Sequence, residues 1–93
     1  MSNPLVSVIM SVYNNENTVK NAIESIVSQS YKNIELIITD DCSSDSSLSI
    51  IKNYVDKKNV KLIENNENKG LTKSLNSMIK VAEGKFIARQ DAD

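Results

Sequence analysis

Aspartate side chains follow apolar runs at two places in this sequence. Asp40 and Asp41 come directly after Ile34–Thr39, and Asp91 and Asp93 follow a similar run near the end of the chain. The β-branched run Ile34–Thr39 predicts a buried parallel strand. Charges are costly inside a protein, but they are tolerated at the carboxyl edge of a parallel sheet, where open α/β sheets bind ligands. The aspartates therefore predict a ligand site at that edge.

Two of the side chains expected at this edge suit a flat, polar ligand. The carboxylate of Asp41 can accept the N–H of a nucleobase or a sugar hydroxyl. Tyr13, in the segment Ser11-Val12-Tyr13 that leaves the first apolar run, can stack on a ring. In the alternative interpretation, Asp40 and Asp41 only start a turn and cap the next helix, and Tyr13 packs over the first helix. The residues alone leave both interpretations open.

Asp91 and Asp93 are two residues apart. On an extended segment both side chains point the same way, so the pair can hold a divalent ion that bridges phosphate oxygens. This spacing arises often by chance, and only its position after a predicted strand favours a metal site here. Arg89 can pair with Asp91 or with a phosphate, and an ordinary surface ion pair is the favoured interpretation.

Other candidates near the expected edge are weaker. Lys69 and Lys73 flank Gly70, where a helix is expected to begin with free N–H groups that could bind an anion. A solvated helix end is the favoured interpretation, because lysines are mostly exposed. Cys42 follows the acidic pair, which disfavours its thiolate and argues against a nucleophile.

The composition limits the function further. The chain has 93 residues and a net charge of −1, which fits one domain and gives no footprint for nucleic acid. Its single cysteine excludes an internal disulfide and fits a reducing compartment. Histidine is absent, so metal binding would depend on oxygen ligands, which favour Mg²⁺ or Mn²⁺. No signal peptide is visible, and the longest apolar stretch, Val6–Val12, is too short to span a bilayer.

Hydrophobic periodicity predicts strands that alternate with helices. The inner faces of the helices carry Val19, Ala22, Ile23, Ile26 and Val27, then Leu48, Ile51, Tyr54 and Val55, then Leu71, Leu75, Met78, Ile79 and Ala82. The predicted strands are Leu5–Val12, Ile34–Thr39, Val60–Ile63 and Lys85–Gln90, the last with Phe86, Ile87 and Ala88 as its apolar middle.

Polar residues and glycine mark the expected helix ends. Asn14 or Asn15 is expected to cap the first helix, with Glu16 in its first turn, and Ser44 or Asp45 to cap the second. The second helix is expected to end at Lys57 and Lys58, and the third to stop at Gly84.

This βαβαβαβ order predicts an α/β fold: a parallel sheet in a three-layer αβα arrangement, joined by right-handed crossovers. The fourth strand would be an exposed edge that ends in two carboxylates. Complete domains normally protect such edges. We therefore expect residues 1–93 to be the front part of a larger domain.

Several motifs occur together in one order. They are Val6-Ser7-Val8-Ile9-Met10-Ser11-Val12-Tyr13-Asn14, Ile23-Glu24-Ser25-Ile26 with Gln29-Ser30-Tyr31, Glu35-Leu36-Ile37-Ile38-Thr39-Asp40-Asp41-Cys42-Ser43-Ser44-Asp45, Asn68-Lys69-Gly70-Leu71 and Asp91-Ala92-Asp93. Over essentially the whole chain, this series resembles the family-2 glycosyltransferases of the GT-A fold, and residues 1–93 correspond to their nucleotide-sugar-binding part, ending at the DxD motif.

The resemblance implies a nucleotide-sugar donor, usually UDP-linked, and a Mn²⁺ or Mg²⁺ ion. Carried over by position, Ser11 and Tyr13 would line the nucleobase pocket, and Asp41 would bind the base N–H. Asp91 would contact the ribose region, and Asp93 would bind the metal. No catalytic residue is expected within this chain, because the family's base lies beyond these aspartates.

The resemblance also implies transfer with inversion to a glycan or lipid-linked acceptor in polysaccharide biosynthesis. The expected location is cytoplasmic, at the inner face of the membrane for the full-length protein. Residues 1–93 alone would bind donor and metal without transferring sugar.

The sequence departs from the family at two positions. Serine stands at position 11, where proline is common, and Cys42 stands where glycine is common.

Other functions have sequence features of their own. A receiver-like signalling domain would carry its Mg²⁺-binding acidic pair after the first strand, whereas here the pair follows the second. An inactive scaffold fragment is a further alternative. A glycine-rich loop after the first strand, expected for a sugar-phosphate nucleotidyltransferase, is missing, as are the G-x-G-x-x-G and Walker A motifs.

Overall fold

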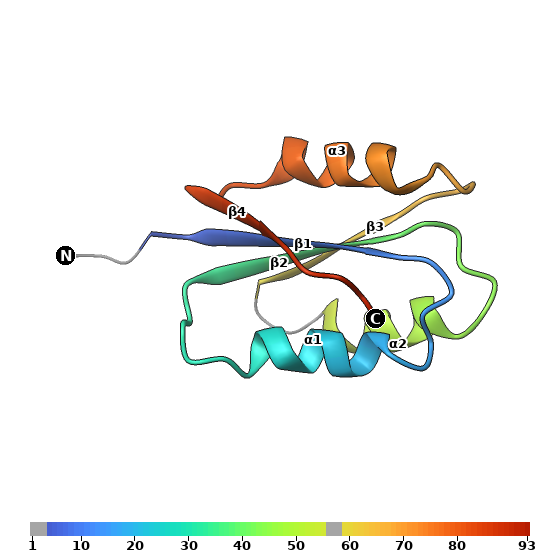
Figure 1. The fold of residues 1–93 in the computed structure, drawn as a ribbon, viewed down its shortest axis with the longest axis horizontal. Coiled ribbons are helices and arrows are strands. Elements are labelled where there is room, and N and C mark those ends of the chain that lie inside the picture. The colour runs from blue at the N-terminus through green and yellow to red at the C-terminus, as the bar shows by residue number, and fades with distance from the viewer. Residues whose placement is uncertain (1–3, 56–58) are drawn as a thin grey trace.

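The computed structural model of the protein describes residues 4–55 and 59–93. Helices and strands alternate along the chain as the sequence predicts (Figure 1). The elements are β1 (Val6–Val12), α1 (Val19–Val27), β2 (Ile34–Asp40), α2 (Ser47–Val55), β3 (Val60–Glu64), α3 (Leu71–Val81) and β4 (Phe86–Arg89).

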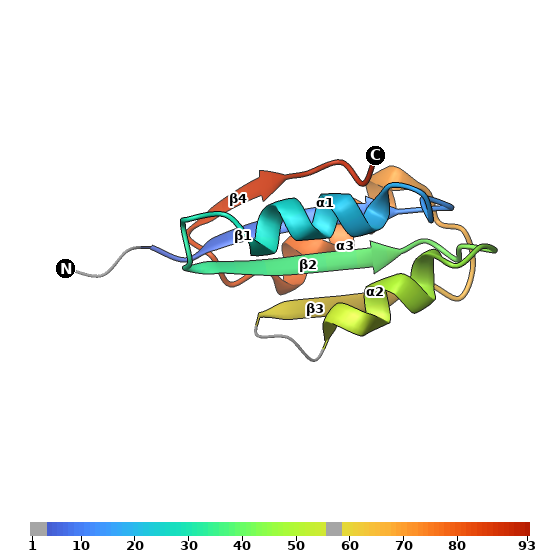
Figure 2. The same ribbon diagram turned by 90° about the horizontal axis from the view of Figure 1, so that it is seen from below.

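The four strands form one parallel sheet in the order β3-β2-β1-β4. The first two crossovers step from β1 to β2 and then to β3, whereas the third returns β4 to the other side of β1. Helices α1 and α2 therefore cover one face of the sheet and α3 covers the other, which gives the expected three layers (Figures 1 and 2). The strand order reverses between β1 and β4, and such a reversal is where open α/β sheets bind ligands.

Alternation along β1 and β2 divides the core between the two faces of the sheet. Val8, Met10 and Ile38 belong to the larger cluster under α1 and α2. Ile9 and Ile37 pack with Met78 of α3 in the smaller cluster. Because β1 and β2 are covered on both faces, their apolar runs are nearly continuous.

Some positions assigned to the inner faces of helices are exposed. Val27, Leu71 and Ile79 lie on the surface, whereas Ser74 and Met78 are the buried residues of α3. Ser74 can be buried because its hydroxyl accepts a hydrogen bond from Asn65 Nδ2. Met78 is buried and Leu75 and Ala82 pack beside it, so the inward side of α3 is narrower than the predicted apolar stripe.

β4 is an edge strand, and all four of its residues are exposed. The structure confirms the predicted strand and its expected place at an exposed edge of the sheet, since within residues 4–55 and 59–93 β4 pairs only with β1. Phe86 is 54% exposed and Ile87 47% exposed.

Element boundaries differ from the predicted ones by one residue. β1 begins at Val6, β2 includes Asp40, β3 includes Glu64, and β4 is shortened to Phe86–Arg89. Lys57 and Lys58, expected at the end of the second helix, lie outside the described residues.

Gly84 was expected to stop α3, but it lies beyond the end of the helix and does not cap it in a left-handed conformation. Helix α3 ends at Val81, and Ala82 after it is extended. A Cβ on Gly84 would lie 2.5 Å from the backbone nitrogen of Ser7, so this position requires glycine because the chain passes against β1.

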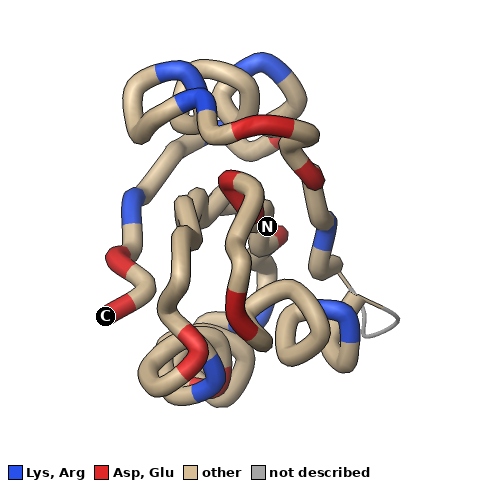
Figure 3. Tube along the Cα trace, turned by 90° about the vertical axis from the view of Figure 1, so that its right-hand side faces the viewer, with Lys and Arg blue, Asp and Glu red and all other residues tan. Residues whose placement is uncertain are grey.

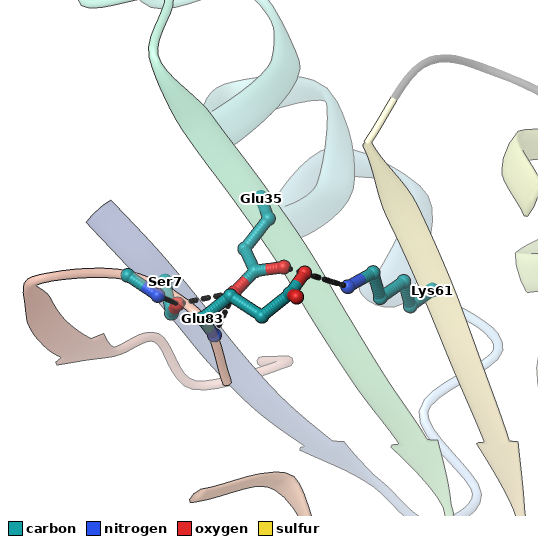
Figure 4. Close-up of polar contacts among 5 residues, drawn as sticks. Ser7, Glu35, Lys61 and Glu83 are labelled. Atoms are coloured by element: carbon teal, nitrogen blue, oxygen red, sulfur yellow. Dashed lines mark hydrogen bonds and ion pairs between the residues drawn. The ribbon is translucent and has the colours of Figure 1, made fainter. Parts of the chain in front are cut away.

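A buried carboxylate holds this turn against the sheet (Figure 4). Glu35 of β2 is 3% exposed and accepts hydrogen bonds from the Ser7 hydroxyl at 2.5 Å and the Glu83 N–H at 2.6 Å. Lys61 of β3 forms an ion pair with Glu35 at 2.9 Å. The Gly84 N–H donates to the Ser7 hydroxyl at 2.8 Å. One carboxylate thus links β1, β3 and the start of β4.

Within residues 4–55 and 59–93, every helix is too short or too polar to cross a membrane.

Candidate functional site

One pocket of about 350 Å³ lies at the carboxyl edge of the sheet. Its lining comes from the segments that follow β1, β2 and β4 and from the loop that leads into α3. The lining residues are Ser11, Tyr13, Asn15, Asp41, Asn68, Gly70, Leu71, Asp91, Ala92 and Asp93. Figure 3 looks onto this edge, where the terminal segment with its acidic positions runs beside the loops. All five residues predicted to bind the nucleotide or the metal, namely Ser11, Tyr13, Asp41, Asp91 and Asp93, therefore line one pocket.

Asp41 is almost completely buried at the base of this pocket, with 3% of its surface exposed. Its Oδ1 accepts hydrogen bonds from Asn65 Nδ2 at 2.9 Å and from the Lys69 N–H at 2.7 Å. Its Oδ2 accepts the Gly70 N–H at 2.9 Å. The carboxylate therefore caps the start of α3, whereas the alternative interpretation of the sequence assigned it to the helix directly after β2, which is α2.

These contacts leave part of the Asp41 carboxylate available. A carboxylate offers about four lone-pair sites, and three are used here. Burial raises the pKa of Asp41, but the hydrogen bonds from Lys69, Asn65 and Gly70 lower it by more, so its pKa lies below the ordinary value. Asp41 is therefore an anion that can accept one further hydrogen bond.

Asp40, next to Asp41, turns away from the pocket. It points to the opposite face of the sheet, as alternation along β2 requires. Its carboxylate accepts the N–H of Ser43 at 3.1 Å and the hydroxyl of the same residue at 2.6 Å. The turn interpretation of Asp40 is confirmed.

The end of the chain brings two carboxylates to the pocket. Gln90 donates its N–H to the Ile9 carbonyl at 3.0 Å, which continues the β4 contact with β1. Ala92 is 4% exposed and packs in the core, so Asp91 and Asp93 on either side of it face the pocket. Arg89 forms an exposed ion pair with Asp91 at 3.5 Å, which is the surface pair the sequence favours. Lys69 and Lys73 are exposed, as expected for a solvated helix end.

The loops after β1 and β2 hold each other in place. Asn14 Oδ1 accepts the Ser44 N–H at 2.8 Å, and the Asn14 N–H donates to the Ser43 hydroxyl at 3.0 Å. The Glu16 carboxylate accepts the Ser46 N–H at 2.9 Å. Asp45 Oδ2 accepts the Glu16 N–H at 3.2 Å. These contacts fix the segments that carry Tyr13 and Asp41.

Two predicted helix caps require correction. Glu16 lies before α1 rather than in its first turn, and its carboxylate serves the start of α2 instead. Neither Asn14 nor Asn15 caps α1 with its side chain; the Asn15 carbonyl accepts the first N–H groups. Asp45 does cap α2, because its Oδ1 accepts the Ser47 N–H at 2.9 Å.

Some pocket residues were absent from the sequence prediction. Asn15, Asn68, Gly70 and Leu71 line the pocket without having been assigned to it. Asn68-Lys69-Gly70-Leu71 had been recognised as a motif, and that was the available signal. Asn15 had been considered only as a cap, because nothing in the sequence indicates which way its amide turns.

The site has the chemistry of a divalent-ion site that is completed by its ligand. Asp91 and Asp93 supply two carboxylates at an open pocket. Among the described residues, no group of three or more acidic, cysteine or histidine side chains could hold a metal. A Mg²⁺ or Mn²⁺ ion that takes one or two carboxylates and its other oxygens from phosphates and water fits this pair.

Comparison with known proteins identifies the family. The glycosyl transferase family 2 profile matches residues 7–93. The chain belongs to glycosyl transferase family 2. This membership favours the glycosyltransferase interpretation over the receiver-like alternative.

Similar proteins occur in several bacteria. EpsE of Bacillus subtilis is 53% identical over 94 residues, covering 99% of this chain and 34% of EpsE. WfaP of Escherichia coli, a UDP-Glc:alpha-D-GlcNAc-diphosphoundecaprenol beta-1,3-glucosyltransferase, is 43% identical over 89 residues, covering 96% of this chain and 35% of WfaP. The chain thus spans about a third of the length of these relatives.

Solved structures share the fold. Staphylococcus aureus TarS 1–349 in complex with UDP-GlcNAc has a TM-score of 0.89 and 34% identity, covering 96% of this chain and 26% of that one. The mannosyltransferase PcManGT of Pyrobaculum calidifontis, in complex with GDP-Man and Mn²⁺, has a TM-score of 0.90 and 26% identity, covering 99% of this chain and 28% of that one. The GT-A assignment of the fold is confirmed.

Proposed function

We propose that residues 1–93 form the N-terminal nucleotide-sugar-binding part of a GT-A enzyme that transfers a sugar from a UDP-linked donor. The observation that carries this proposal is the single pocket in which Tyr13, Asp41 and Asp93 lie together. A relative with a UDP-Glc donor and a similar structure with bound UDP-GlcNAc support the choice of UDP.

In this proposal the nucleobase lies against Tyr13. Tyr13 is 49% exposed and lines the pocket, which suits a ring that stacks on a base. Ser11 lines the pocket beside it. The remaining lone pair of Asp41 accepts the N–H of the base, and its ionised state excludes the opposite hydrogen-bond direction.

The diphosphate lies toward the end of β4 in this proposal. Asp91 accepts a hydroxyl of the ribose, and Asp93 holds Mn²⁺ or Mg²⁺ with the help of phosphate oxygens. When bound, the ion supplies positive charge that stabilises the diphosphate leaving group. PcManGT, which was solved with Mn²⁺, supports this assignment.

The rest of the reaction belongs to residues outside this segment. We place the general base and the acceptor site beyond residue 93, with inversion at the anomeric carbon and a glycan or lipid-linked acceptor. The name of WfaP, which acts on a diphosphoundecaprenol-linked sugar, supports a lipid-linked acceptor in polysaccharide biosynthesis. Such an enzyme works on the cytoplasmic side, at the inner face of the membrane.

The experiment is donor hydrolysis or transfer by the full-length protein. UDP-glucose, UDP-GlcNAc and GDP-mannose are supplied with Mn²⁺, and release of the nucleoside diphosphate is measured. We expect release from a UDP-sugar that stops when EDTA is added. Tyr13→Ala should raise KM for the donor, whereas Tyr31→Ala, which lies outside the pocket, should not. Absence of release and of binding with all three donors would refute the proposed function.

A further inference from the structure

We propose that Asn15 is a specificity-determining residue, whose carboxamide donates a hydrogen bond to the C4 carbonyl of the nucleobase, which uracil has and cytosine lacks, beside the N–H accepted by Asp41. This inference rests on the proposed function, because it concerns the base of the donor bound in the same pocket. Asn15 lines that pocket together with Ser11, Tyr13 and Asp41.

The orientation of the Asn15 amide follows from its neighbour. The backbone N–H of Tyr13 points at this side chain, with the acceptor at 2.9 Å. A backbone N–H can only donate, so the atom that receives it must be Oδ1. The Nδ2 group is therefore turned the other way. Among residues 4–55 and 59–93 it donates to no partner, so both of its N–H groups are available to a ligand.

Asn15 is also held firmly through its backbone. Its N–H donates to the hydroxyl of Ser47, a buried residue at the start of α2, at 2.8 Å. Its carbonyl accepts the N–H of Thr18 at 3.0 Å and that of Val19 at 2.8 Å. A polar group that is fixed before the ligand arrives loses little conformational freedom on binding, which is what a specificity contact requires.

The pocket therefore presents one donor and one acceptor to a base. Asn15 supplies N–H groups, and ionised Asp41 supplies an oxygen that cannot donate. Uracil offers an N–H flanked by two carbonyl groups, which matches this pair. Cytosine offers a ring nitrogen that only accepts at the same position, with an amino group on one side. A site built for one direction of hydrogen bonding rejects the opposite pattern strongly, because buried groups are left unpaired.

The test compares UDP and CDP affinities of the full-length protein with Mn²⁺ by calorimetry. Asn15→Asp keeps the oxygen that accepts the Tyr13 N–H and replaces both donors with a second acceptor. We expect its ratio of UDP to CDP affinity to fall about tenfold or more. Asn17→Asp introduces the same charge on the same loop at an exposed residue outside the pocket, and it should keep the wild-type ratio.

Analogues of UDP test the contact without a variant. In 2-thio-UDP and 4-thio-UDP, sulfur replaces one carbonyl oxygen and accepts hydrogen bonds more weakly. Wild-type protein should lose affinity for 4-thio-UDP and keep it for 2-thio-UDP, and the reverse result would overturn the contact. Equal affinity for UDP and both analogues, or an unchanged UDP-to-CDP ratio in Asn15→Asp, would overturn the role of Asn15 and leave the proposed function standing. Wild-type protein that binds neither UDP nor CDP would refute both.

Discussion

Asp41 Oδ2 accepts the backbone N–H of Gly70 at 2.9 Å, across 29 residues of sequence. This contact joins the end of β2 to the start of α3 at the base of the pocket. The same carboxylate has one lone pair left for a ligand. Asp41 therefore serves the fold and the site at once, and any ligand that it binds also contacts a residue that holds α3 in place.

Replacement of Asp41 by asparagine should impair both roles. Whichever way the new amide turns, its Nδ2 faces at least one N–H that the carboxylate accepted. We expect a loss of about 1–3 kcal/mol in the free energy of unfolding, measured by urea titration, and weaker UDP binding by calorimetry. Asp40→Asn is the matched control, because Asp40 lies outside the pocket. Unchanged donor affinity in Asp41→Asn would remove the base-binding role of Asp41.

The buried Glu35 should make stability depend on pH. Burial raises its pKa, but the hydrogen bonds from Ser7 and Glu83 and the contacts with Lys61 together lower it by more. The pKa of Glu35 therefore lies below the ordinary value of 4.5. Because the pKa of Glu35 is lower in the folded state than in the unfolded state, its ionised carboxylate stabilises the fold at pH values above the unfolded-state pKa of 4.5. This stabilisation is lost as the pH falls below 4.5 and through the pKa of the folded state.

Urea unfolding between neutral and acidic pH measures this contribution. Glu35→Gln should be less stable than wild type near pH 7 and should lose less stability on acidification. Glu67→Gln, which removes an exposed carboxylate, controls for the change in charge. If Glu35→Gln and wild type lose stability in parallel below pH 4.5, the role given to Glu35 is wrong.

Asn14 should stabilise the fold through both its backbone conformation and its side-chain amide. Its φ of 52° is in the left-handed region, and its Oδ1 accepts the Ser44 N–H. Asn14→Ala loses this acceptor and tolerates the conformation less well, so we expect a loss of about 1–2 kcal/mol. Asn14→Asp keeps an oxygen and tolerates positive φ, and it should recover most of the difference. Thermal unfolding measures both variants; equal midpoints would contradict this explanation.

Cys42 stands in a conformation that suits glycine better. Its φ is 63°, which costs a residue with a Cβ about 1–2 kcal/mol. Glycine removes this cost but loses about 0.5–1 kcal/mol through its more flexible unfolded chain. Cys42→Gly should therefore be slightly more stable than wild type. Cys42→Val, with a β-branched side chain, should be clearly less stable. The order of their urea midpoints is the measurement, and the reverse order would show that the loop does not hold this conformation.

The sequence predicted the fold well because its strongest signals are local. The β-branched run Ile34–Thr39 and the alternation of strands with helices were enough to place the elements and to bring Asp41 and Asp93 to one edge. The role of Asp41 at the start of α3 and that of Glu16 at the start of α2 depend on contacts 28 to 30 residues away. Helix propensity and capping preferences describe only near neighbours, so they assigned Glu16 to the wrong helix.

The remaining errors have a similar origin. Leu71 and Ile79 were expected inside because they are apolar, but they are exposed, and apolar periodicity alone did not show that only Leu75, Met78 and Ala82 of that stripe reach the sheet. Asn15 could not be assigned to the pocket, because only the position of the Tyr13 N–H decides where its amide points.

The proposed function requires one nucleotide and one ion to meet in the pocket beside Asp41 and Asp93. The most direct measurement is calorimetric titration of UDP into the protein with and without Mn²⁺, for wild type and for Asp93→Ala. We expect binding that requires Mn²⁺ and that is lost in Asp93→Ala. A folded protein that ignores both UDP and Mn²⁺, or one whose Mn²⁺-dependent binding survives in Asp93→Ala, would contradict the proposed function.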